Sequence, residues 1–226
     1  MNRIKGIIFD LDGTLLLSMH VWDSVGSSYL RRQGVTPDPD TDDRIKNCTV
    51  EDACAYFRAR YGLSASAEEI AADVNAALRH EYFDLLQPKP GVLAFLEGFR
   101  RAGVKMCVAT ATDRPLVEPA VKRCGIGKYM EAIFTCTEVG KGKDSPAIYR
   151  QAASLLGFPH EEIAVFEDAP YAAKTAKADG FFLVGVYDDS YRNRQEELRA
   201  LADLYLPDYL SADPVKLLLG QKTQSG

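Results

Sequence analysis

The chain has 226 residues, 46% of them hydrophobic and 26% charged, which suits one globular domain or a domain with an insert rather than a disordered chain. Its formal net charge of −5 excludes a general electrostatic attraction to nucleic acid or to an anionic membrane. Asp10 interrupts the first apolar run, and no run approaches the length of a membrane-spanning helix. We therefore expect a cytoplasmic protein with neither nucleic acid nor membrane as a partner.

The cysteines do not form a pattern typical of disulfides. They are odd in number and contain no C-x-x-C pair, and Cys107 lies inside an apolar run. A reducing compartment keeps such thiols free. We expect no disulfide among Cys48, Cys54, Cys107, Cys124 and Cys136.

Short β-branched runs alternate with longer amphipathic segments along most of the chain. This alternation is typical of a parallel sheet with helices on both faces, so we predict a doubly wound α/β fold. The predicted strands are residues 4–9, 104–109, 132–134, 163–166, 182–186 and 204–206. The predicted helices between them are residues 92–101, 114–124, 145–156, 169–178 and 191–202.

Residues 18–86 break this alternation, because they contain helical patterns and no convincing strand. Ser66 and Glu69 have the spacing of a capping box, and apolar residues follow at helical intervals. We predict an all-α cap domain at 18–86, inserted into an α/β core formed by residues 1–17 and 87–226.

Acidic and hydroxyl side chains follow three of the predicted strands. Asp10 and Asp12 follow the first strand, Thr110 follows the second, and Glu167 with Asp168 follows the run IAVF. Ligands bind beyond the carboxyl ends of the strands in an open parallel sheet, so these groups are expected to meet there. Carboxylates this close repel one another unless a cation is present, and hard oxygen ligands favour Mg²⁺. The pattern therefore indicates a magnesium site suited to phosphoryl chemistry, with Lys143 from the segment GKGK as the balancing cation.

Four motifs in order resemble the haloacid dehalogenase superfamily of phosphatases and phosphomutases. They are DLDGTL at residues 10–15, the threonine at 110, K-x-x-P-x-I-Y at 143–149 and VFED at 165–168. Together they span nearly the whole chain. The helical insert after the first motif resembles the branch that includes β-phosphoglucomutase and phosphoglycolate-phosphatase-like enzymes.

The resemblance implies a role for each matched residue. Asp10 would be the nucleophile that forms an aspartyl-phosphate, and Asp12 the general acid and then the general base. Thr110 and Lys143 match the phosphate-binding threonine and lysine. The implied magnesium ligands are Asp10, Asp12, Glu167 and Asp168. The candidate substrate contacts are Thr14, Arg44, Lys46, Ala111 and Thr112.

The cap departs from the family pattern at several positions. Leu17 and Ser18 stand where the family commonly has Asp-Ser, so Ser18 is predicted to cap the next helix instead. The mutase relatives carry an arginine where we align Val50 and a histidine where Trp22 falls. A mutase must grip a bisphosphate, so the loss of these groups favours a phosphatase, although Arg44 or Lys46 could substitute.

We therefore predict a Mg²⁺-dependent phosphatase that acts on a small phosphorylated metabolite. An intramolecular phosphomutase acting on a sugar phosphate is the alternative, and a non-catalytic phosphate-binding protein is a third interpretation. We expect a monomer, with a homodimer as the alternative. Arg114 is equally suited to an anion contact and to a solvated surface.

Overall fold

Six parallel strands form the central sheet of the protein. The computed structural model describes residues 4–45, 48, 50–213 and 216. The strands are β1 (Gly6–Phe9), β2 (Lys105–Thr110), β3 (Ile133–Thr135), β4 (Ile163–Glu167), β5 (Phe182–Val186) and β6 (Leu204–Leu206), in the order β3-β2-β1-β4-β5-β6. All six predicted strands are present within two residues of their expected bounds, and every pairing is parallel.

The central strand β1 is buried on both faces, which explains its continuous apolar sequence. Successive side chains of a strand point to opposite faces. Ile7 and Phe9 accordingly pack into the larger hydrophobic cluster, whereas Ile8 packs into a second cluster on the other face. A strand that is buried on both faces needs a covering layer on each side, and helices form both layers here. The predicted α/β class is confirmed.

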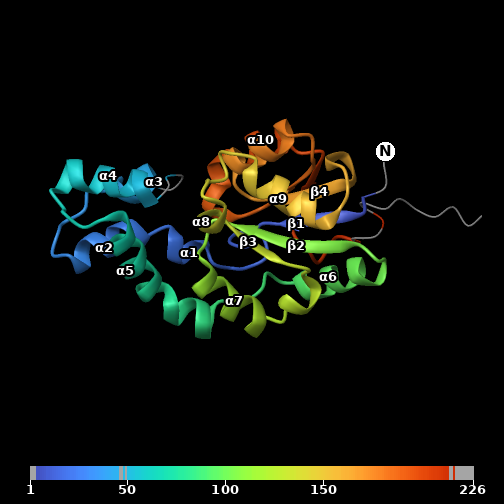
Figure 1. Cartoon of the computed structure of the whole chain (residues 1–226), viewed down its shortest axis with the longest axis horizontal. Helices are drawn as coiled ribbons and strands as arrows, with labels where there is room; N and C mark the ends of the chain where they lie inside the picture. The colour runs from blue at the N-terminus through green and yellow to red at the C-terminus, as the bar shows by residue number, and fades with distance from the viewer. Residues whose placement is uncertain (1–3, 46–47, 49, 214–215, 217–226) are drawn as a thin grey trace, which may run out of the picture.

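Helices cover both faces of the sheet (Figure 1). One face carries α6 (Val92–Arg101) and α7 (Arg114–Arg123), and the other carries α9 (Ala147–Leu156), α10 (Pro170–Ala178) and α11 (Gln195–Leu201). Shorter turns of helix connect these elements: η2 (Gly127–Tyr129), α8 (Cys136–Val139), η3 (His160–Glu162) and η4 (Asp189–Arg194). The sequence did not predict α8, which is only four residues long.

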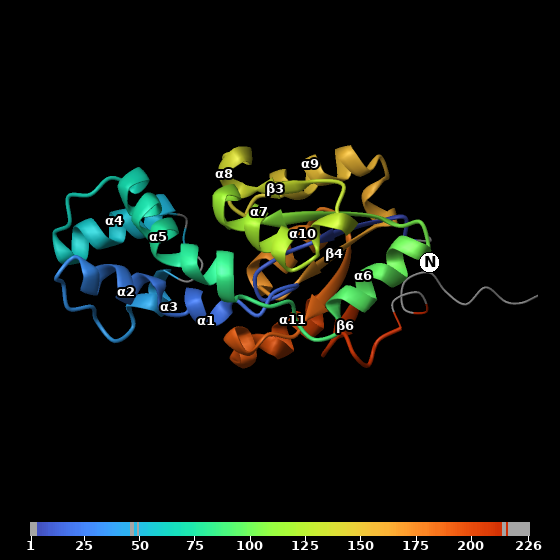
Figure 2. The same ribbon diagram turned by 90° about the horizontal axis from the view of Figure 1, so that it is seen from below.

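The described residues of the segment between β1 and α6 contain helices and loops but no strand. It contains α1 (Met19–Trp22), α2 (Val25–Arg32), α3 (Thr41–Ile45), α4 (Val50–Tyr61), α5 (Ala67–His80) and the π-helix η1 (Glu81–Leu85). Figures 1 and 2 show α2 to α5 as a group at one end of the molecule, beside the sheet. The capping box of Ser66 and Glu69 is confirmed, because each side chain accepts a hydrogen bond from the backbone N–H of the other residue. The division into two domains at 17/18 and 86/87 stays a prediction.

Two chain segments join the helical segment to the sheet and run side by side. The N–H of Leu17 donates to the carbonyl of Gln87 at 2.9 Å, and the N–H of Lys89 donates to Leu15 at 2.8 Å. The Leu17 side chain is exposed. Ser18 precedes α1, but its hydroxyl makes no capping hydrogen bond, so the predicted cap is wrong. The serine side chain is buried instead and faces away from solvent.

All five cysteines are free, as the sequence predicts. Three of them are buried. None of the helices in the described part of the chain is long and apolar enough to cross a membrane.

Candidate active site

Three carboxylates from two neighbouring strands meet at the carboxyl edge of the sheet. Phe9 of β1 pairs with Phe166 of β4, so the residues that follow them lie side by side. Oxygen atoms of Asp10, Glu167 and Asp168 lie within 4.8 Å of one another, and all three residues are buried. The structure thus brings together three of the four side chains predicted to bind magnesium.

The side chain of Lys143 reaches the same cluster from the turn that precedes α9. Its ammonium donates a hydrogen bond to Oδ1 of Asp10 and another, at 2.5 Å, to Oε1 of Glu167. Tyr149 of α9 donates to the same Glu167 oxygen at 2.8 Å. The Lys143 side chain is only 3% exposed, so these contacts are shielded from water. Lys143 therefore serves as the cation of a buried ion-pair network.

The network contains more negative than positive groups. Burial raises the pKa of Glu167 to about 7, since the nearby Lys143 ammonium only partly offsets it. Burial, together with the Asp10 and Glu167 carboxylates, raises the pKa of Asp168 well above its usual range. Burial alone would lower the pKa of Lys143, but Asp10 and Glu167 outweigh it and raise that pKa well above its ordinary value. One ammonium among three carboxylates leaves a site that favours a further cation.

The donor atoms of the cluster suit magnesium. Oδ2 of Asp10 and Oδ2 of Asp168 are buried and accept no hydrogen bond from any described residue. Buried carboxylate oxygens without a partner are costly, whereas Mg²⁺ prefers oxygen ligands of this kind. The residues present therefore fit a magnesium ion held by Asp10 and Asp168, with Glu167 beside it.

The Asp12 side chain lies outside this cluster, although Asp12 is among the residues predicted to bind the metal. Its Oδ1 accepts a hydrogen bond from Tyr82 at 2.5 Å, and its Oδ2 accepts one from Thr112 at 2.6 Å. Burial, followed by repulsion from Asp10, raises the pKa of Asp12, while both hydroxyl donors oppose the rise. The carboxyl group is held between two hydroxyl donors, next to the nucleophile candidate.

Two buried threonines lie near the carboxyl edge of the sheet, and one of them contacts the cluster. Thr14 donates from Oγ1 to Oδ1 of Asp168 at 3.0 Å, and its carbonyl accepts a hydrogen bond from Tyr209 at 3.1 Å. Thr110 ends β2, and its buried Oγ1 accepts the N–H of Thr112 at 3.1 Å. The hydroxyl of Thr14, a candidate substrate contact, is therefore directed at a carboxylate.

A comparison with protein families agrees with this geometry. A family model described as "Hydrolase: haloacid dehalogenase-like hydrolase" matches residues 4–180. The chain belongs to the haloacid dehalogenase-like hydrolases. Relatives named as phosphatases place it among the phosphoric monoester hydrolases of that family.

Two curated relatives and two solved structures illustrate the likeness. Hexitol phosphatase A of Escherichia coli is 27% identical and covers 81% of this chain and 83% of its own. Validoxylamine A 7'-phosphate phosphatase of Streptomyces hygroscopicus is 29% identical over 90% of this chain and 93% of its own length. CbbY of Rhodobacter sphaeroides, solved with phosphate, has a TM-score of 0.79 at 23% identity over 92% of this chain and 96% of that one. A family IA hydrolase of Entamoeba histolytica has a TM-score of 0.81 at 18% identity over 96% of this chain and 100% of that one. At these identities the two solved structures support the fold alone.

In this haloacid dehalogenase-like hydrolase, the other substrate-contact candidates have different surroundings. Thr112 is buried against Asp12, and Ala111 beside it is exposed. Arg44 forms an exposed ion pair with Asp40, at 2.7 Å. Arg114 is bound by Glu118 and Glu138, which matches a surface role rather than an anion contact. Lys46 and the side chain of Val50 lie outside the described residues.

Two tyrosines at the site of this hydrolase were not predicted from the sequence. Tyr149 is the last residue of the K-x-x-P-x-I-Y motif and holds Glu167. Tyr82 lies 70 residues from Asp12 in sequence and occupies an apolar position of a helical pattern. The motif could have indicated Tyr149, because Tyr149 lies six residues after Lys143 on a predicted helix. Nothing in the sequence around Tyr82 indicates its contact with Asp12.

Proposed function

We propose that this chain is a Mg²⁺-dependent phosphatase that hydrolyses a small phosphorylated metabolite through an aspartyl-phosphate on Asp10. The observation that carries the proposal is the state of the Asp10 carboxylate. Lys143 binds Oδ1, while the buried Oδ2 accepts no hydrogen bond from any described residue. A buried carboxylate that an ammonium holds at one oxygen, and whose other oxygen is open to a metal ion, is fixed in position for attack on a phosphorus atom.

The proposed first step is attack of a carboxylate oxygen of Asp10 on the phosphorus atom of the ester. The new bond joins phosphorus to that oxygen, and the bond from phosphorus to the leaving oxygen breaks. Asp12 gives its proton to that oxygen and so prevents a charged alkoxide from accumulating. Lys143 stabilises negative charge on the phosphoryl oxygens and on Asp10, and Thr110 is proposed to donate a hydrogen bond to them.

In the proposed second step, water attacks the phosphorus atom and releases inorganic phosphate. Asp12, now ionised, accepts a proton from that water, and Asp10 is restored as a carboxylate. Asp10 and Asp168 would hold the magnesium ion, with Glu167 beside it. The ion would neutralise phosphoryl charge as the nucleophile approaches. The helical segment would act as a cap that excludes bulk water.

The relatives suggest the class of substrate. Their names specify a hexitol phosphate, the 7'-phosphate of validoxylamine A and phosphorylated carbohydrates. We therefore propose a phosphorylated sugar or sugar-derived alcohol as the substrate, acted on by a cytoplasmic monomer.

A substrate screen tests this proposal. The wild-type enzyme is incubated with Mg²⁺ and a panel of sugar phosphates, polyol phosphates and an aryl phosphate, and free phosphate and isomerised sugar phosphate are scored separately. Phosphate release that Asp10→Asn abolishes without loss of fold supports the phosphatase. An isomerised product without phosphate release would favour the phosphomutase, and turnover retained by Asp10→Asn would contradict the nucleophile assignment.

A further inference from the structure

Three side chains form a hydrogen-bonded line that ends on Asp12. The indole Nε1–H of Trp22 donates to the hydroxyl oxygen of Tyr82 at 2.7 Å. The Tyr82 hydroxyl donates to Oδ1 of Asp12 at 2.5 Å. Thr112 binds the other oxygen of the same carboxyl group at 2.6 Å. The family comparison and the four motifs give no role to Trp22 or Tyr82.

The direction of these hydrogen bonds follows from the chemistry of the donors. An indole N–H can only donate, so the Tyr82 oxygen must accept from Trp22. Tyr82 then has its single hydroxyl proton left for Asp12. The tyrosine hydroxyl cannot turn toward another acceptor without losing one of its two hydrogen bonds. The direction from which it holds Oδ1 of Asp12 is therefore fixed.

Trp22 and Tyr82 both belong to the helical segment, whereas Asp12 and Thr112 belong to the sheet and its loops. Trp22 ends α1, and Tyr82 lies in the π-helix η1. Single π-helical turns frequently occur at functional sites, where they re-aim a side chain. Thus one oxygen of Asp12 is held from the helical segment and the other from the core.

Packing fixes the tyrosine in place. Tyr82 is fully buried, and its ring meets that of Trp22 edge-on, with centroids 6.5 Å apart at 80°. Arg123 of α7 donates to the carbonyls of Leu86 and Tyr82, and so ties the end of the π-helix to the core. A buried ring with bonded neighbours on both sides has little freedom to reorient.

We propose that Tyr82, supported by Trp22, is a positioning residue that sets the direction of the Asp12 carboxyl group. This inference rests on the proposed function, in which Asp12 exchanges protons with the leaving group and with water. An Asp12 oxygen that exchanges a proton must turn its remaining lone pair toward the reacting oxygen, and the hydrogen bond from Tyr82 to Oδ1 sets the direction of that lone pair.

The first test removes only the tyrosine hydroxyl. For Tyr82→Phe, we expect kcat to fall about tenfold more for an alkyl phosphate than for p-nitrophenyl phosphate, because only the alkoxide needs a proton when it leaves. We expect KM to change by less than about twofold, because Tyr82 does not touch the substrate. An equal loss of kcat on both esters would overturn the proposal.

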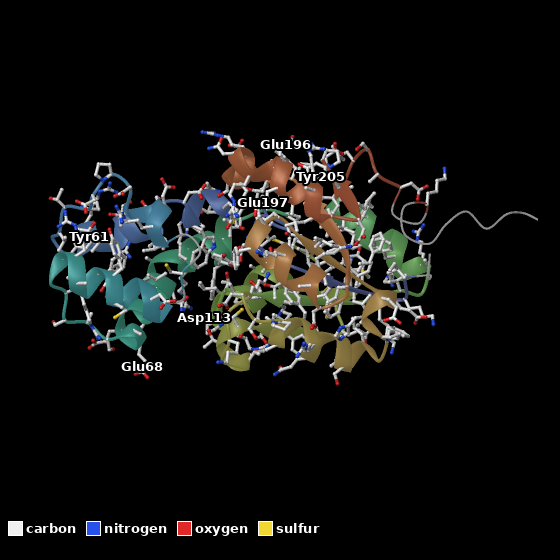
Figure 3. The ribbon with its side chains drawn as sticks, turned by 90° about the horizontal axis from the view of Figure 1, so that it is seen from above. Tyr61, Glu68, Asp113, Glu196, Glu197 and Tyr205 are labelled. Carbon is white, nitrogen blue, oxygen red and sulfur yellow. The ribbon has the colours of Figure 1, made fainter. Side chains whose placement is uncertain are left out.

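Matched controls remove hydroxyls elsewhere (Figure 3). The Tyr61 hydroxyl shares a hydrogen bond of 2.6 Å with Thr41 inside the helical segment, and the Tyr205 hydroxyl donates to Gln195 at 2.6 Å in the core. Tyr61→Phe and Tyr205→Phe should leave the ratio of kcat on the two esters unchanged. A change of that ratio in either control would attribute the effect to stability and contradict a specific role for Tyr82.

A double-mutant cycle tests whether Tyr82 acts through Asp12. In an Asp12→Ala background, Tyr82→Phe should cost less than about twofold in kcat on the alkyl ester, because the group that it positions is gone. Trp22→Phe should change the ratio of kcat on the two esters in the same direction as Tyr82→Phe, but by a smaller factor. Independent, multiplicative losses in the Asp12→Ala background would overturn the positioning role.

A spectroscopic measurement separates this inference from the proposed function. Trp22 is the only tryptophan in the chain, so its indole N–H gives one resonance in a ¹H–¹⁵N spectrum. Tyr82→Phe should move that resonance upfield, because the indole loses its acceptor, while Tyr205→Phe should leave it in place. This result would hold even if no phosphate ester were turned over. If Tyr82→Phe leaves the resonance in place, the proposed line of hydrogen bonds is overturned. If Tyr82→Phe does not fold, Trp22→Phe alone provides the comparison of kcat on the two esters.

Discussion

A Cβ atom placed on Gly13 would overlap Oδ2 of Asp168. Gly13 also has a φ of +80°, a conformation that costs a residue with a side chain about 1 kcal/mol or more. The backbone at Gly13 therefore lies so close to the Asp168 carboxylate that no side chain fits between them. We predict that Gly13→Ala displaces Asp168 and lowers kcat/KM on an aryl phosphate by about 100-fold or more, as expected when a misplaced group moves by about 1 Å.

Gly34 offers the matched control for this substitution. Its φ is +75°, but a Cβ atom there would meet no described atom within 4 Å. Gly34→Ala should cost a similar backbone penalty of about 1 kcal/mol in unfolding free energy and leave kcat/KM unchanged. Equal activity of the two variants would show that the contact between residue 13 and Asp168 does not matter.

Replacement of Lys143 tests the buried ion-pair network. Lys143→Met leaves Asp10 and Glu167 without their cation, and removal of one partner from a buried pair typically costs about 3–5 kcal/mol. We predict a loss of this size in the unfolding free energy without Mg²⁺ at pH 8, measured by urea denaturation. Lys5→Met removes an exposed ion pair with Glu162 and should cost less than about 1 kcal/mol. A loss below about 1 kcal/mol for Lys143→Met would argue against a network of charged groups.

The sequence predicted the strands and the clustered side chains well, for a physical reason. Residues that follow buried parallel strands must gather at one edge, so the strands and the residues after them were enough to predict that Asp10, Glu167 and Asp168 meet. Lys143 was predicted from a motif, and its side chain does reach that edge. Both inferences depend on local pattern plus the topology of a doubly wound sheet.

Contacts made over long sequence distances could not be predicted in this way. The contact of Tyr82 with Asp12 depends on how the helical segment is placed, and its π-helix breaks the regular helical period. The direction of the Thr14 hydroxyl toward Asp168 depends on loop geometry. The Ser18 cap was wrong because the hydroxyl is buried, which the residue type does not reveal.

The capping box of α5 should contribute to stability alone. Ser66→Ala removes the acceptor for the Glu69 N–H, and loss of such a cap typically costs about 1 kcal/mol. We predict a decrease of this size in the unfolding free energy, with kcat unchanged at room temperature. Ser154→Ala, at an exposed position inside α9, should be neutral or slightly stabilising, because alanine is the better helix former there. A large loss of kcat in Ser66→Ala would instead indicate that α5 affects the site directly.

The buried carboxylates should make stability depend on pH and on Mg²⁺ in a linked way. The pKa of Glu167 is raised from its usual value of 4.5 to about 7, and that of Asp168 is raised well above its own usual value. A carboxyl group whose pKa is raised by folding binds more protons in the folded state, so its stabilising effect is present below its unfolded pKa. That effect is lost as the pH rises through the folded pKa. In EDTA, we therefore predict that the unfolding free energy falls between pH 4.5 and about 7 as Glu167 ionises, with Asp168 adding to the loss.

Mg²⁺ should reverse this loss, because it binds the ionised carboxylates of the folded state. At a concentration of about 100 times its Kd, Mg²⁺ should add about 2.7 kcal/mol, or roughly 5–10 °C in Tm for a chain of this size, at pH 8. The gain should shrink toward pH 5, where protons compete for the same oxygens. Asp168→Asn should raise the metal-free Tm at pH 8 and abolish the response to Mg²⁺, whereas Asp84→Asn, at an exposed position of the helical segment, should retain it. A Mg²⁺ response of equal size at pH 5 and pH 8 would mean that the ion binds somewhere other than this carboxylate cluster.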